Sequence, residues 1–76
     1  MKDQLLVRIG KRLKNYRRAE GLTKEEVAAE LGISPTTLGA YERGDRELRM
    51  DKVKELARIY NTTITELTDY KNIELN

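Results

Sequence analysis

The sequence predicts an all-α, compact five-helix domain. Its 76 residues suit a single domain, and they include only one Pro and five Gly. Leu, Ile, Val and Tyr recur at spacings of three and four, the period of an amphipathic helix. Capping sequences separate these apolar stripes. With 38% hydrophobic residues, the chain can bury a small, mainly aliphatic core.

The first apolar stripe extends from Leu6 to Tyr16 and predicts a helix over residues 3–19. The other faces of this helix carry Lys and Arg side chains. Gly21 follows the stripe, and glycine commonly comes directly after a helix because it accepts a positive φ. The first helix is therefore expected to end just before Gly21.

Two short helices follow. Thr23 with Glu26 three residues later is a capping box, which predicts the start of a second helix that stops at Gly32. Ser34 then caps a third helix over residues 35–42, with a proline in its first position. Each of these helices is too short to be stable without tertiary contacts.

Gly39 lies inside the predicted third helix, where glycine is unfavourable. In a helix interior, Gly costs about 1 kcal/mol relative to Ala. We therefore expect a compensating reason for this glycine, such as close packing or the close approach of a ligand.

Two more helices are expected in the C-terminal part. The stripe from Val53 to Tyr60 forms the core face of a fourth helix, and Asp51 lies in its first turn, where the helix dipole favours a carboxylate. Thr63 begins a second capping box, which opens a short fifth helix. The C-terminal tail, residues 71–76, is compatible with a strand or a frayed end.

The composition excludes several classes of function. Without Cys or His, the chain has no disulfide framework, no cysteine zinc site and no histidine general base. No apolar run approaches the roughly 18 residues needed to span a bilayer, and no secretory leader is recognisable. We therefore expect a cytoplasmic protein that is not an enzyme, with no cofactor, no metal, no membrane partner and no evident small-molecule ligand.

Charge is unevenly distributed along the chain. Residues 1–24 hold eight bases and two acids, whereas residues 25–76 hold seven bases and eleven acids. A basic block beside an acidic remainder suits a protein that turns one face to a polyanion. A solvated helix face would give the same distribution, so charge alone leaves both interpretations open.

The junction of the second and third helices is the most informative feature. The sequence Gly32-Ile33-Ser34 separates two capped helices, which together form a helix-turn-helix over about residues 23–42. The second helix of such a pair can lie in a DNA major groove. Helix pairs with a glycine corner also occur in proteins that bind no nucleic acid.

Residues 9–67 resemble the lambda-repressor-like helix-turn-helix domain of the Cro/repressor type, also called the xenobiotic-response-element family. Six segments agree with this family in order and spacing: Ile9–Leu13, Gly21–Ala28, Leu31–Ser34, Tyr41–Gly44, Leu56–Ala57 and Ile64–Leu67. The resemblance covers about three quarters of the chain.

The resemblance implies a helix-turn-helix DNA-binding domain over residues 1–70 and a role as a bacterial or phage transcription regulator. It implies a homodimer on a palindromic operator of double-stranded DNA, with the helix over residues 35–42 in the major groove. Repression is favoured over activation, and the protein would act on the nucleoid. An alternative is a protein-interaction module on the same helices, such as an antitoxin-like partner.

Base contacts would come from the outward side of the recognition helix, formed by Pro35, Thr36, Thr37 and Ala40. None of these residues is the Arg or Gln that many family members carry, so bidentate contacts to guanine or adenine are not available. We expect readout through DNA shape and through apolar contact with thymine methyl groups. For the two threonines, ordinary polarity of a helix start is the alternative.

Phosphate contacts are expected from Thr23, Lys24, Arg43 and Arg46. Lys24 stands where the family often has a Gln that touches the DNA backbone. Solvated surface charge is the alternative for Lys24 and Arg46. Arg17 and Glu42 match a family pair that forms a salt bridge between the first helix and the recognition helix, and we interpret them as structural.

Dimerisation is expected through residues 64–76, in which Tyr70, Ile73 and Leu75 supply apolar surface. A tail that folds back on its own core, or that is disordered, is the alternative.

Overall fold

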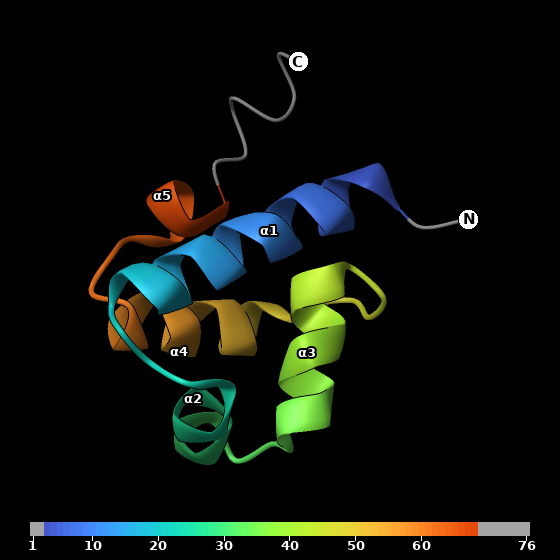
Figure 1. Cartoon of the computed structure of the whole chain (residues 1–76). Coiled ribbons are helices and arrows are strands. Elements are labelled where there is room, and N and C mark those ends of the chain that lie inside the picture. The colour runs from blue at the N-terminus through green and yellow to red at the C-terminus, as the bar shows by residue number, and fades with distance from the viewer. Residues whose placement is uncertain (1–2, 69–76) are drawn as a thin grey trace.

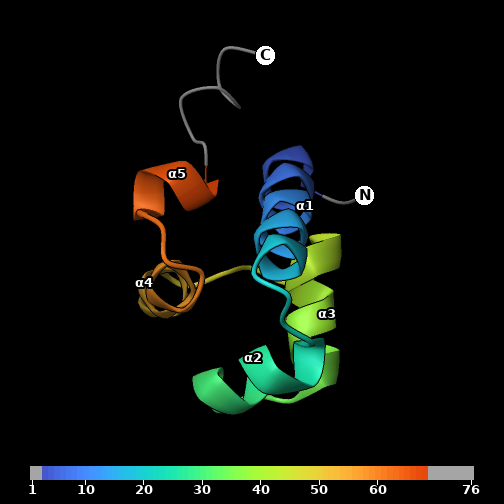
Figure 2. The ribbon, with the colours of Figure 1, turned by 60° about the vertical axis from the view of Figure 1, so that its left-hand side comes forward.

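The computed structural model describes residues 3–68. This part of the chain contains five helices and no strand, so the predicted all-α class is confirmed. The helices are α1 (Gln4–Ala19), α2 (Lys24–Leu31), α3 (Pro35–Arg43), α4 (Met50–Ile59) and α5 (Ile64–Thr68). In Figure 1, α1 crosses above α4 and the upper end of α3, α5 lies beside α1, and α2 lies at the lower end. Figure 2 shows the same arrangement with α1 seen nearly along its axis.

Side chains cap the N-terminal ends of α1, α2, α3 and α5, whereas α4 begins without a side-chain cap. Asp3 Oδ1 accepts a hydrogen bond of 2.8 Å from the N–H of Leu5 and so begins α1. In α2 the expected capping box is present: Thr23 Oγ1 accepts from the N–H of Glu26 at 3.1 Å, and Glu26 Oε1 accepts from the N–H of Thr23 at 2.9 Å. These bonds satisfy donors that the first helical turn leaves without intrahelical partners.

The first four helices end with one shared backbone motif. A residue with positive φ follows each helix, and the residue after it donates its N–H to the carbonyl five positions back, as Ile33 does to Ala28 at 3.0 Å. The positive-φ residues are Gly21, Gly32, Gly44 and Asn61. Each helix therefore stops sharply, and short connections can reverse the chain direction between helices.

Gly10 allows a close approach between two helix backbones. A Cβ atom at this position would lie 2.5 Å from the carbonyl oxygen of Glu42 and 2.6 Å from that of Tyr41. Any side chain larger than hydrogen would push α3 away from α1. Gly10 therefore sets the distance between α1 and the C-terminal end of α3.

The core takes one fully buried aliphatic side chain from every helix. These are Leu13, Val27, Leu38, Leu56 and Leu67, each with 0% of its surface exposed. Each helix thus contributes to one shared core, as expected when short helices depend on tertiary packing for their stability.

Tyr60 is buried in this core with its hydroxyl oxygen unpaired among the described residues. Burial disfavours the phenolate and raises the pKa of Tyr60, and the Glu42 carboxylate adds to the rise, while Arg17 opposes it. The ring supplies apolar contact, whereas the buried hydroxyl lacks the hydrogen bonds that water would give it.

We expect Tyr60→Phe to leave the free energy of unfolding at pH 7 unchanged or to raise it by up to about 1 kcal/mol, because it removes a buried unpaired hydroxyl. Above about pH 10 the unfolded tyrosine loses its proton while the native one keeps it, so the wild type loses about 1.4 kcal/mol per further pH unit from this group. Tyr60→Phe removes that loss. Urea unfolding at pH 7 and pH 11 measures both effects.

Tyr16→Phe is the matched control, because Tyr16 is half-buried and its hydroxyl lies 3.4 Å from Thr62 Oγ1. A Tyr60→Phe variant that is clearly less stable at pH 7 than the wild type would contradict the prediction.

Candidate nucleic-acid interface

Helices α2 and α3 form the helix-turn-helix, and the turn between them fixes their relative orientation. Gly32 adopts φ +69° at the corner, and Ile33 is half-buried against the core. Ser34 then caps α3 by accepting a hydrogen bond of 3.0 Å from the N–H of Thr37. One side of α3 packs on the domain through Leu38 and Tyr41. No other helix covers its outer side in Figures 1 and 2.

The residues expected to contact bases lie in three different environments. Pro35 and Thr36 are exposed at the start of α3, whereas Ala40 is half-buried one turn later. Thr37 takes part in the helix cap, because its Oγ1 accepts a hydrogen bond of 3.0 Å from Ser34 Oγ. Pro35 and Thr36 are therefore the most accessible of the four side chains.

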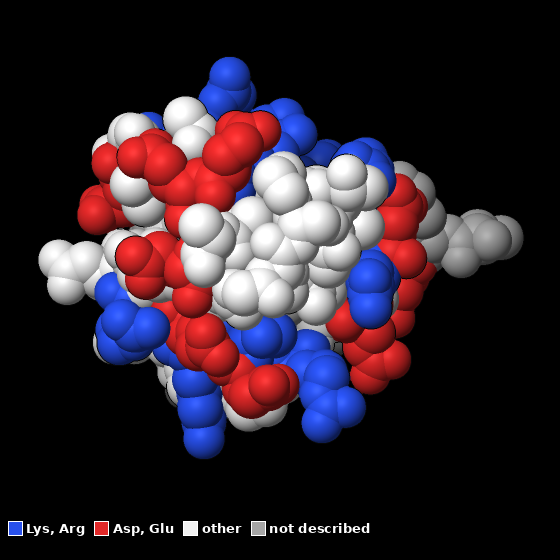
Figure 3. Space-filling view, turned by 90° about the horizontal axis from the view of Figure 1, so that it is seen from below, with Lys and Arg blue, Asp and Glu red and all other residues white. Residues whose placement is uncertain are grey.

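The surface around the turn carries no charge at its centre. Figure 3, which looks at the lower end of Figure 1 where α2, α3 and their turn lie, shows uncharged atoms in the middle and both Lys or Arg and Asp or Glu atoms around them. An uncharged centre with cations at its edge suits contact with base edges flanked by phosphates.

The residues expected to contact phosphates come from three elements. Lys24 is half-buried at the first position of α2, and Thr23 caps that helix from an exposed position. Arg43 is the last residue of α3, and its Nε lies 2.9 Å from Asp45 Oδ2. Arg46 is exposed in the connection to α4. Asp45 was not singled out from the sequence, although an acid two positions after an Arg is a recognisable signal.

Arg17 and Glu42 meet in a buried ion pair that joins α1 to α3. Arg17 Nε lies 2.7 Å from Glu42 Oε2, and Arg17 Nη2 lies 3.2 Å from Glu42 Oε1. A third bond, from Arg17 Nη1 to the carbonyl of Leu22 at 3.0 Å, reaches the connection between α1 and α2. The hydrogen bond with Glu42 raises the pKa of Arg17, so the guanidinium stays charged. This bidentate geometry fixes direction as well as distance.

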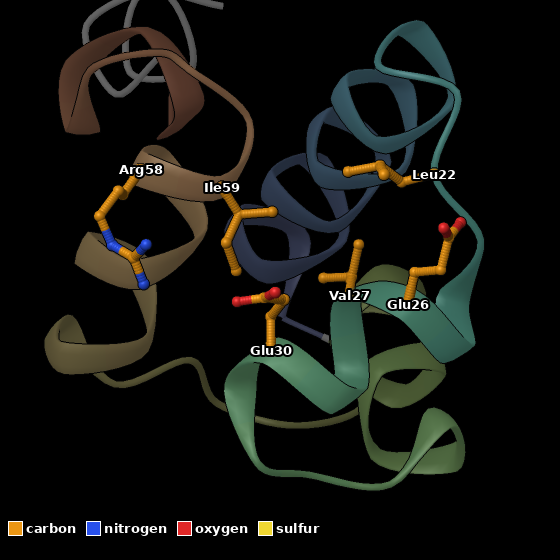
Figure 4. Close-up of a pocket in the computed structure, with 6 residues that line it drawn as sticks. All are labelled: Leu22, Glu26, Val27, Glu30, Arg58 and Ile59. Atoms are coloured by element: carbon orange, nitrogen blue, oxygen red, sulfur yellow. The ribbon is translucent and has the colours of Figure 1, made fainter.

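The opposite side of α2 faces α4 across an open groove of about 500 Å³. Glu26 and Glu30 line it from α2, and Arg58 and Ile59 line it from α4, as Figure 4 shows. The two carboxylates on this wall of the groove would repel a polyanion such as DNA. Helix α2 therefore has the Lys24 side chain on the side that faces α3, and Glu26 and Glu30 on the side that faces α4.

The residues expected at a dimer interface, Tyr70, Ile73 and Leu75, lie outside the described residues. Beside the end of α5 is a mostly apolar groove of about 460 Å³. Its lining includes Ile9, Leu48, Met50, Val53, Ile64 and Thr68. Met50 was not singled out from the sequence, yet 58% of its surface is exposed.

The described part of the chain lacks two other kinds of site. Between residues 3 and 68, no helix has the length and apolar character needed to cross a membrane. In the same range, no three acidic side chains are grouped in a way that could hold a metal ion.

The sequence pattern of the helix-turn-helix family matches residues 13–67 of the chain. The chain is 39% identical over 62 residues to the HTH-type transcriptional regulator ImmR of Bacillus subtilis, covering 82% of this chain and 46% of ImmR. It is 34% identical over 56 residues to the cryptic phage CTXphi transcriptional repressor RstR of Vibrio cholerae, covering 74% of this chain and 50% of RstR. The chain thus spans about half the length of these curated relatives.

Solved structures are also similar. The restriction-modification controller protein C.AhdI from Aeromonas hydrophila superimposes with a TM-score of 0.77 at 34% identity, over 82% of this chain and 94% of that one. The DNA-binding domain of BldD superimposes with a TM-score of 0.76 at 29% identity, over 88% and 97%.

We expect Glu42→Ala to lower the free energy of unfolding by about 3–5 kcal/mol, because it leaves the Arg17 guanidinium buried without its partner. The double variant Arg17→Met/Glu42→Leu should recover most of this loss, since it leaves no buried charge. Urea unfolding of both variants measures the effect. Equal stability of Glu42→Ala and the wild type would contradict a structural role for the pair.

Proposed function

The chain belongs to the helix-turn-helix family of the Cro/C1 type, and on this premise we propose that it is a sequence-specific, double-stranded-DNA-binding transcriptional regulator that acts as a repressor. The observation that carries the proposal is the outer side of α3, which is uncovered by other helices and has the cationic ends of Lys24 and Arg43 close to it at Gly39. The relatives are named as transcriptional regulators and a repressor, which supports a regulatory rather than a catalytic role.

In the proposed complex, α3 enters the major groove, which is wide enough for an α-helix. Pro35 and Thr36 reach base edges first, and Ala40 follows one turn later. Their methyl and methylene groups suit the thymine methyl group. With no Arg or Gln on this side, much of the selectivity comes from DNA shape and deformability. Thr37 contributes chiefly through the cap that fixes the start of α3.

Thr23, Lys24, Arg43 and Arg46 contact phosphates beside the inserted helix. Such contacts set the register of the protein on the duplex without reading its sequence. Because each cation displaces condensed counterions, they also make binding strongly dependent on salt.

One domain of this size reads only a few base pairs, so we propose a homodimer on a palindromic operator, acting on the nucleoid in the cytoplasm. Tyr70, Ile73 and Leu75 would supply the dimer contact. Support comes from the mostly apolar groove lined by Met50 and Ile64, because Thr68, the last described residue, also lines it. Bound at its operator, the dimer blocks polymerase by occupancy.

The uncharged outer side of α3 also suits a protein partner, so a protein-interaction module is the second candidate. The two functions differ in their response to salt, because a pure interaction module has no reason to bind random duplex.

We expect the protein to bind a random-sequence 20-base-pair duplex at 50 mM salt, and to lose affinity by about 10²–10³-fold at 200 mM, the effect of about four to six phosphates neutralised by a dimer. Fluorescence anisotropy with labelled duplex measures it. No binding at 50 mM salt would reject the DNA-binding proposal and favour the interaction module.

Two variants then distinguish phosphate contacts from base contacts. Arg46→Gln should weaken binding to all sequences alike, whereas Thr36→Ser, which removes a methyl group, should change the bases selected from a random pool.

A chain truncated after Thr68 should sediment as a monomer, because it lacks the three proposed interface residues. A truncated chain that still forms the same dimer would exclude the tail from the interface.

A further inference from the structure

Gly39 has an environment that distinguishes it from Gly10, the other glycine inside a helix. At Gly10 a Cβ atom would meet backbone atoms of α3, so that glycine is required for packing. At Gly39 the neighbours of a Cβ atom would be two cationic groups: Arg43 Nη1 at 3.1 Å and Lys24 Nζ at 3.9 Å. Packing between helix backbones therefore does not explain Gly39.

Two cations from different helices thus converge over one point of α3. Since Lys24 Nζ and Arg43 Nη1 lie 3.9 and 3.1 Å from the same position, they are at most about 7 Å apart. Like charges at this separation repel one another. Phosphate oxygens accept hydrogen bonds from such groups at about 2.7–2.9 Å, so one phosphate can reach both nitrogens.

Asp45 fixes the direction of one of these groups. Its carboxylate holds Arg43 Nε at 2.9 Å, while Nη1 of the same guanidinium lies over Gly39. A planar guanidinium held at one edge presents its other edge in a defined direction. Arg43 is therefore oriented across the surface of α3 toward Lys24.

We propose that Gly39 is the floor of a phosphate-binding site in which Lys24 and Arg43 bind one phosphodiester group of the DNA backbone together. The proposal rests on the proposed DNA-binding function and adds to it a shared contact and a reason for the glycine. A methyl group at position 39 would push the end of the Arg43 side chain outward and separate the two cations. Glycine keeps the space between them open, at a cost to helix stability.

This arrangement predicts that stability and DNA affinity change in opposite directions. Gly39→Ala should raise Tm by about 2–8 °C, because alanine favours the helix and the Arg43 side chain can move aside. The same variant should bind random duplex about 10-fold more weakly at 100 mM salt. The slope of log affinity against log salt should fall by about 0.9 per protomer, the value for one lost phosphate contact. Gly10→Ala is the matched control and should lower Tm.

A mutational cycle tests whether Lys24 and Arg43 cause the effect of Gly39→Ala on DNA affinity. The double variant Lys24→Met/Arg43→Met should lose about one phosphate contact per protomer, because both side chains bind the same group, and each single variant should lose no more than that. Adding Gly39→Ala to the double variant should not weaken binding further. If it does, the glycine acts through close approach of the helix backbone to DNA, and the shared phosphate site is overturned.

The remaining outcomes are also distinct. If the wild type binds duplex and Gly39→Ala binds equally well with the same salt slope, the phosphate site is overturned and the DNA-binding function stands. If the double variant loses about two phosphate contacts per protomer, the cations bind separate phosphates and the proposal is again overturned. If the wild type itself binds no duplex, the function and the site fail together.

Discussion

Arg17 and Glu42 meet where α1, the connection to α2 and α3 come together. Their two hydrogen bonds tie α3 to α1, and a third, from Arg17 to the Leu22 carbonyl, ties α1 to the connection before α2. Gly10 brings the backbones of α1 and α3 close enough for this pair to form next to the core. A buried ion pair adds little net stability, but its bidentate geometry restricts the angle between the helices. The outer side of α3 depends on that angle for its accessibility.

The rest of the fold keeps five short helices in one arrangement by local means. The first four helices end at a positive-φ residue, and α2 and α3 begin with a side-chain cap. These features fix where each helix begins and ends, while the five fully buried aliphatic side chains hold the helices together. A domain with so small a core gains much from each capped end, because single caps contribute about 1 kcal/mol.

Charge is separated across α2. Lys24 lies against α3, whereas Glu26 and Glu30 line the groove that faces α4. A polyanion would be attracted to one side of this helix and repelled from the other. The net charge of +2 gives little indication of this separation. Under the proposed function, the same helix would direct the duplex to α3.

The sequence by itself determined the helices, because the signals that start and stop them lie within a few residues of each end. It predicted α1 over residues 3–19 and α3 over 35–42, and the observed bounds differ by one residue. Resemblance to a known family, rather than spacing, suggested that Arg17 would reach Glu42. Only the tertiary structure decided which side chains meet over Gly39, and that the Tyr60 hydroxyl is buried with no partner between residues 3 and 68. Such contacts join residues far apart in the sequence, so they depend on the angles and distances at which helices pack.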